Sequence, residues 1–103
     1  MSKWRLPTIN ELHSAFDYES GEPRMDWFNP KIYWSSTTQA KYTKYAWVVN
    51  FSIGDIFDHL KSDISYVCCV REAEDGTLGW SKSSKDQMTW HEAYEYCKRM
   101  NNE

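Results

Sequence analysis

The sequence predicts an α+β fold in which two helices pack on an antiparallel sheet. Two helix-start motifs lie near opposite ends of the chain, one at Thr8 with Glu11 and the other at Thr89 with Glu92. Between them, residues 33–71 hold segments rich in aromatic and β-branched residues, which favour strands. Because these segments are grouped rather than alternating with helices, the order favours antiparallel pairing. At 103 residues the chain is expected to form a single domain, residues 1–103.

The first predicted helix begins with a capping box. In this motif the Thr8 side chain accepts a hydrogen bond from a first-turn amide, and the Glu11 side chain reaches back to the Thr8 amide. Ile9, Leu12 and Phe16 follow at helical spacing. This pattern predicts a helix of about ten residues.

Residues 17–32 have no clear period and contain Gly21, Pro23 and Pro30, so they are predicted to form a long surface loop. The loop carries Trp27 and Phe28. Loops of this length are often functional.

The strands are predicted from aromatic and β-branched content, with turns marked by polar residues and glycine. Residues 52–55, which include Gly54, are predicted to join two of the strands as a hairpin. The second capping box opens a helix with an apolar stripe that includes Trp90, Ala93 and Cys97. The predicted strands are residues 33–38, 45–51, 56–60, 66–71 and a short one at 78–81.

The charge pattern excludes some classes of partner. The net charge is −3, and Lys and Arg are mixed with Asp and Glu. A nucleic-acid binder is therefore not expected, because it needs a concentrated basic surface. No segment is long and apolar enough to span a membrane, so no membrane partner is expected. As written, the start lacks the pattern of a secretory signal, which predicts a cytoplasmic protein, with an extracellular or virion-associated location as the alternative.

The three cysteines, Cys68, Cys69 and Cys97, are too few to predict a disulfide framework. On a strand, Cys68 and Cys69 would point to opposite faces, so at most one is expected to face the core. That one could pair with Cys97. In a reducing compartment, the expectation is free thiols instead.

Several blocks of sequence resemble the Lcl C-terminal domain family of bacteria and phages. The resemblance is carried by WRLPTINEL at 4–12, YWSST at 33–37, AWVVNF at 46–51 and YVCCVR at 66–71, and extends to 75–80 and 88–97. That family is similar to C-type lectin-like and sulfatase-modifying-factor folds. The resemblance therefore implies a C-type lectin-like fold.

The order of the blocks differs from the family. The family usually places the helix that corresponds to residues 89–97 before the WRLPT block, whereas here it comes last. The resemblance thus implies a circular permutant with adjacent termini. It also places Cys69 at the family's cysteine position, and so implies that Cys69 and Cys97 meet, either as a disulfide or as a thiol pair.

No catalytic or metal-binding constellation is evident, so we expect no enzyme activity, no metal site and no cofactor. His13, His59 and His91 are isolated, without a second ligand at metal-binding spacing. Ser35 and Ser36 lack the glycine-flanked turn of a hydrolase nucleophile. Trp4, Trp34 and Trp47 are expected to be core rings, and Arg5 a planar donor to a carboxylate or to the backbone.

The candidate binding residues are aromatic and basic residues in segments without core periodicity. Tyr, Trp and nearby cations are typical anchors of protein interfaces. The alternative is that these rings cover the core beneath their own loops. The candidates are Tyr18, Trp27 and Phe28 on the long loop, and Lys41, Tyr42 and Lys44 on the polar connection after residue 38.

These observations favour a non-enzymatic binding module. The first expectation is a small phage- or bacteria-encoded protein that binds, and thereby inhibits, a protein partner. The alternative is a carbohydrate-binding or adhesin module of a bacterial surface protein, by analogy with the adhesin after which the family is named. A homodimer formed by exchange of the last helix is a further expectation.

Overall fold

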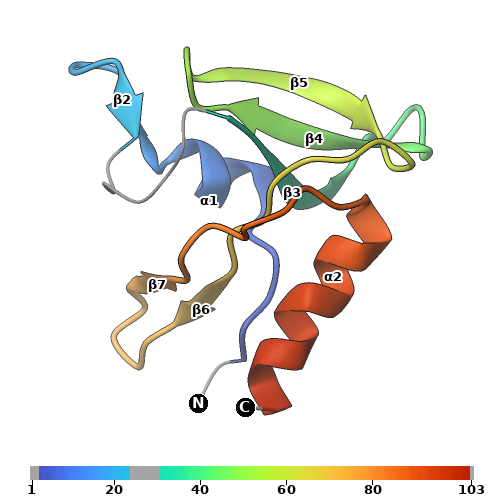
Figure 1. The fold of residues 1–103 in the computed structure, drawn as a ribbon. Coiled ribbons are helices and arrows are strands. Elements are labelled where there is room, and N and C mark those ends of the chain that lie inside the picture. The colour runs from blue at the N-terminus through green and yellow to red at the C-terminus, as the bar shows by residue number, and fades with distance from the viewer. Residues whose placement is uncertain (1–2, 24–30, 103) are drawn as a thin grey trace.

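The computed structural model describes residues 3–23 and 31–102, and its backbone is shown in Figure 1. It has the α+β architecture that the sequence predicts, with two α-helices and antiparallel sheets. The strands form a three-stranded sheet in the order β3-β4-β5 and two separate hairpins, β1-β2 and β6-β7. The elements are α1 (Ile9–His13), β1 (Phe16–Asp17), β2 (Glu22–Pro23), β3 (Ile32–Thr38), β4 (Tyr45–Asn50), β5 (Asp55–Leu60), β6 (Val70–Glu72), β7 (Leu78–Trp80), α2 (Trp90–Arg99) and the short 3-10 helix η1 (Met100–Asn102).

Strands β3 and β4 of the three-stranded sheet carry buried residues on both faces. Trp34 on β3 lies opposite Val48 on β4, and both belong to a cluster that includes Ala93 and Cys97 of α2. The neighbouring pair, Tyr33 and Val49, belongs to a second cluster, which includes Leu12 of α1. Successive side chains of a strand point to opposite faces, so the two clusters cover opposite sides of the sheet.

Two indole groups fasten α2 to the sheet. Trp34 Nε1 donates to the Met88 carbonyl at 2.8 Å, and Trp90 Nε1 donates to the Ser35 carbonyl at 3.0 Å. Both rings can therefore be buried without leaving an indole N–H unsatisfied. The start of α2 is fixed against β3 as a result.

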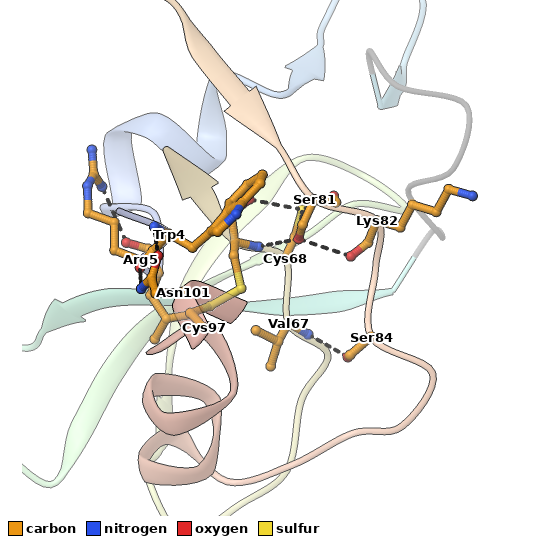
Figure 2. Close-up of a disulfide and its surroundings, with 11 residues drawn as sticks. Trp4, Arg5, Val67, Cys68, Ser81, Lys82, Ser84, Cys97 and Asn101 are labelled. Carbon is orange, nitrogen blue, oxygen red and sulfur yellow. Dashed lines mark hydrogen bonds between the residues drawn. A yellow bond between two sulfur atoms is a disulfide. The ribbon is translucent and has the colours of Figure 1, made fainter. Parts of the chain in front are cut away.

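The predicted strand at residues 66–71 is only partly a strand, because β6 begins at Val70. Before that point two serines replace a neighbouring strand. The Ser81 N–H donates to Cys69 O at 2.9 Å while Ser81 Oγ accepts from Cys69 N, and Ser84 and Val67 exchange bonds in the same way. Figure 2 shows the Val67–Ser84 bond. Paired serine backbone and hydroxyl groups thus satisfy this buried chain without a regular ladder.

Cys68 and Cys69 are both fully buried, so the expectation that at most one faces the core was wrong. Their side chains do point in different directions: Cys69 belongs to the cluster beneath α2 and Cys68 to the cluster beneath α1. The segment runs between two clusters. Opposite orientation is therefore compatible with burial of both.

Helix α1 has the predicted capping box but is half the predicted length, because it ends at His13. The Ser14 hydroxyl donates to the Glu11 carbonyl and the Ala15 N–H donates to Leu12 O, which ends the helix. Phe16 then enters β1 and packs in the second cluster. Phe16 is therefore placed by its packing in the core and not by a continuation of the helix that its spacing predicts.

Helix α2 agrees with its prediction more closely. Its capping box is complete, since Thr89 Oγ1 accepts from the Glu92 N–H and Glu92 accepts from the Thr89 N–H. Part of the predicted 17–32 loop is instead ordered as the β1-β2 hairpin, in which Phe16 pairs with Pro23. The candidate residues Trp27 and Phe28 lie outside the described residues.

Candidate interaction surface

The residues of the WRLPT block build the scaffold. Arg5 donates to both carboxylate oxygens of Glu11, at 2.7 and 2.9 Å, and to Glu72 at 3.2 Å. The Arg5 guanidinium is the main reason that the pKa of Glu11 falls from 4.5 to about 2. Arg5 also donates to the Leu6 carbonyl, so it contacts both carboxylate and backbone, as expected.

The expected core tryptophans differ in burial. Trp34 is fully buried. Trp4 is partly buried, packs against the cluster beneath α2 and lies under the Arg71 guanidinium, 4.7 Å from its ring centroid. Trp47 is partly exposed. Only Trp34 is therefore a fully enclosed ring.

Cys69 and Cys97 form a disulfide with a Cα–Cα distance of 5.7 Å, which ties α2 to the chain just before β6 (Figure 2). This is the pair that the family resemblance implies. Cys68 is the free cysteine, and burial raises the pKa of its thiol to about 12. The Cys68 thiol donates to the Ser81 carbonyl at 2.9 Å, so it is a packed, protonated group rather than a nucleophile.

Residues near the two ends of the described chain contact each other. The Trp4 N–H donates to Asn101 Oδ1 at 2.8 Å, and Asn101 Nδ2 donates to Trp4 O at 3.1 Å. Figure 1 shows this segment beside the last turn of the α2 region. The Asn101 amide thus satisfies the backbone groups of Trp4, while those of the next residue, Arg5, pair with Val70.

One group of side chains has the residue types of a hydrolase triad. His59 Nδ1 lies 3.1 Å from Ser65 Oγ, and His59 Nε2 lies 3.4 Å from the Asp63 carboxylate. Ser65 is fully buried, however, so its hydroxyl cannot meet a substrate. The ring of His59 also packs on Trp34, with centroids 5.6 Å apart. We assign this group to packing.

Among the described residues, no cluster of three or more His, Cys, Asp or Glu side chains could hold a metal ion. None of the helices in that part of the chain is long and apolar enough to cross a membrane.

Tyr18 lies at the end of the sheet where β4 turns into β5. It is 61% exposed, but its hydroxyl donates to the Gly54 carbonyl at 2.5 Å and also contacts His13 Nε2. Its ring meets Phe16 edge-on, with centroids 5.1 Å apart. Tyr18 therefore holds the β1 region against the β4-β5 turn.

Lys41, Tyr42, Lys44 and Tyr45 lie together at the opposite end of β4. We call this group the lysine–tyrosine surface. Tyr42 is 56% exposed, and within the described residues its side chain has only ring contacts, with Tyr45 at 6.4 Å and with the Lys41 amine at 5.9 Å. The turn itself is closed by hydrogen bonds from Gln39 N to Tyr45 O and from Tyr45 N to Tyr42 O. Tyr42 is thus presented on a fixed turn.

A cavity of about 470 Å³ adjoins this surface, and we call it the basic cavity. Thr43 and Lys44 line it from the start of β4, residues 60–62 from the end of β5, and Thr89 and His91 from the start of α2. Figure 1 shows these three chain segments converging at one end of the sheet. The Lys61 amine lies 3.9 Å from the Trp90 ring centroid and donates to Thr38 Oγ1.

The structure therefore separates the predicted site residues. It brings Lys41, Tyr42 and Lys44 together and puts Tyr18 at the other end of the sheet. Lys61 and His91 were not predicted as site residues, because the cavity is built from three segments that are separate in the sequence. The capping box at Thr89 was the sequence feature that pointed to this region, since it places the start of a helix there.

The model of the Lcl C-terminal domain family matches residues 1–71. The chain belongs to this family. The matched part of this Lcl C-terminal domain holds α1 and all three strands of the larger sheet, whereas β7 and α2 lie beyond it. The disulfide joins Cys69 in the matched part to Cys97 outside it. No curated protein and no solved structure matches the chain.

Proposed function

We propose that this Lcl C-terminal domain is a non-enzymatic binding module that holds a protein partner at the lysine–tyrosine surface. The observation that carries the proposal is the state of Tyr42. Its ring is more than half exposed, and its turn is fixed by hydrogen bonds. Fixed, amphipathic rings lose little conformational entropy on binding and are typical interface anchors.

The neighbouring residues also suit an interface. Lys41 and Lys44 flank Tyr42 in the sequence, and the basic cavity can receive a side chain from the partner. For a small acidic domain of a bacterial and phage family, we propose that binding inhibits the partner. The alternative is a carbohydrate-binding or adhesin role, which would also use exposed aromatic rings.

Affinity capture with matched variants tests this function. The wild-type protein, Tyr42→Ala and Tyr18→Ala are used as baits in a bacterial lysate. The proposal expects one protein, recovered in stoichiometric amount by the wild type and by Tyr18→Ala, to be lost with Tyr42→Ala. Capture that depends equally on both tyrosines would contradict it. Binding on a glycan array that persists in the presence of a chelator would favour the carbohydrate alternative.

We further propose that the fold is C-type lectin-like and circularly permuted. Two observations support this: the family match stops before the helix that the family places first, and Trp4 and Asn101 exchange two hydrogen bonds. The test is a chain whose natural ends are joined and which is reopened before Thr89, restoring the family order. It is expected to fold with similar stability, and failure to fold would contradict the permutation.

The homodimer formed by helix exchange stays a prediction. In that dimer α2 of one copy would dock on the sheet of the other, in the position that α2 has in Figure 1. Light scattering at increasing concentration would detect it. A constant monomer mass would exclude it.

A further inference from the structure

The basic cavity is a preformed site. The Lys61 N–H donates to the Lys44 carbonyl at 2.9 Å, and the Trp90 N–H donates to the Lys61 carbonyl at 3.1 Å. The three segments that line the cavity are therefore hydrogen-bonded to one another. A ligand that enters it need not order the backbone, and this lowers the entropic cost of binding.

The cavity is also lined by two lysines, and no carboxylate in the described part of the chain pairs with them. Within residues 3–23 and 31–102, no carboxylate forms an ion pair with Lys41, Lys44 or Lys61. Two acidic residues close in the sequence to the lining residues have other partners: Glu92 accepts from the Thr89 N–H, and Asp63 pairs with His59. The ammonium groups of these three lysines are thus without a carboxylate partner among the described residues, although the whole chain has a net charge of −3.

The size and surroundings of the cavity suit an acidic polypeptide. Its volume of about 470 Å³ can hold one side chain of a bound polypeptide together with parts of the adjacent residues. Thr43, Ser62 and Thr89 add hydroxyl groups to its wall. Leu60 and the nearby Tyr42 ring add apolar surface. A nucleic acid would instead need a basic track along the molecule, and the acidic remainder of the domain would repel it.

We infer that the basic cavity binds a carboxylate side chain from an acidic segment of the partner, while an apolar side chain of the same segment packs on Tyr42. This inference rests on the proposed function and specifies the chemistry of the partner. Lys44, which has no ion pair with a described residue, supplies one positive charge. Lys61, held over Trp90, supplies a second positive charge in a fixed position. Complementary charge of this kind selects the partner and accelerates its association.

Selection from a random-peptide library tests the inference. Peptides displayed on phage are selected on the wild-type protein, on Lys44→Gln and on Lys85→Gln. Lys85→Gln removes the same charge from an exposed position outside the cavity and serves as the matched control. We expect the wild-type and Lys85→Gln pools to be enriched in Asp and Glu, and the Lys44→Gln pool not to be. Calorimetry on the most enriched peptide should show binding to Lys44→Gln weakened about tenfold, and weakened by added salt.

The outcomes separate the two proposals. Peptides that lose affinity with Tyr42→Ala but not with Lys44→Gln would overturn the acidic-segment inference and leave the protein-binding function standing. Loss with neither variant would overturn both. Selection of no peptide, or tighter binding of a single-stranded oligonucleotide than of any peptide, would also overturn the inference. Equal thermal unfolding of Lys44→Gln and Lys85→Gln checks that both variants are folded.

Discussion

Tyr18 and Tyr42 lie at opposite ends of β4 and are exposed to a similar degree, yet they differ in what their side chains do. The Tyr18 hydroxyl bonds to Gly54 and contacts His13, and its ring packs on Phe16. The Tyr42 side chain has no hydrogen bond to any described residue, and the two residues that follow it, Thr43 and Lys44, line an open cavity. The exposed fraction of a side chain therefore does not measure its availability to a partner. Availability depends on whether the polar tip of the ring is already engaged.

The largest expected effect comes from breaking the disulfide that holds α2, and with it one wall of the basic cavity. Cys97→Ser should lower the free energy of unfolding by roughly 3 to 4 kcal/mol, because the bond closes a loop with a sequence separation of 28. Urea unfolding with and without reductant measures this. In Cys97→Ser, amide hydrogen exchange should accelerate more at Ala93, on α2, than at Gly54, in the β4-β5 turn. Equal acceleration would show that these two regions do not unfold independently.

The end of the sheet at the β4-β5 turn, where Tyr18 packs, can be destabilised by a substitution at Gly54. This residue has a φ of 77°, and an added Cβ would lie 2.5 Å from Phe16 Cε2. Gly54→Ala should therefore destabilise the domain by about 3 kcal/mol, from backbone strain and overpacking together. Gly76 is the matched control, since its φ is 86° but nothing lies within 4 Å of an added Cβ, and Gly76→Ala should cost about 1 kcal/mol. Equal unfolding midpoints would contradict the proposed tight packing of Phe16 on Gly54.

Removal of a single hydroxyl compares the two tyrosines directly. Tyr18→Phe should cost about 1 kcal/mol, because it leaves the buried Gly54 carbonyl without its donor. Tyr42→Phe should change stability by less than about 0.5 kcal/mol. Thermal unfolding of the two variants is the measurement. A larger loss with Tyr42→Phe would mean that the tyrosines have been assigned the wrong roles.

The last expected effect, similar in size to that of Tyr18→Phe, concerns pH and Glu11 of helix α1. The pKa of Glu11 is about 2 in the folded protein, below its ordinary value of 4.5, so its contribution to stability is present above about 4.5 and is lost as the pH falls towards 2. Arg5 is 39% exposed and water screens the pair, so the contribution is about 1 kcal/mol. Glu11→Gln keeps a capping side chain and should lose this pH dependence. A parallel loss of stability in wild type and variant between pH 5 and pH 2 would exclude the pair as its cause.

The sequence predicted best those features that depend on local chemistry. Both capping boxes, the strands around Trp34 and Val48, and the β4-β5 hairpin formed where local patterns placed them. Predictions failed where distant parts of the chain decide the outcome. Phe16 is not helical but packs with Phe51 in the core, and the amides of Val67 and Cys69 donate to serines that follow in the sequence.

The candidate site follows the same rule. Local composition identified Lys41, Tyr42 and Lys44 as a group. It could not identify Lys61, because the role of that residue depends on Trp90, which is distant in the sequence. Nor could it separate Tyr18 from Tyr42, since the carbonyl that engages Tyr18 belongs to a turn on another strand pair.

The two hydrogen bonds between Trp4 and Asn101 have a practical consequence for protein engineering. A domain in which residues near the two ends of the described chain lie this close can be inserted into an exposed loop of a host protein without separating the two ends of that loop. The lysine–tyrosine surface would then face outward from the host, because it lies at the far end of α2 from Asn101. Such a chimera would present the proposed binding surface on one side, with both junctions on the opposite side.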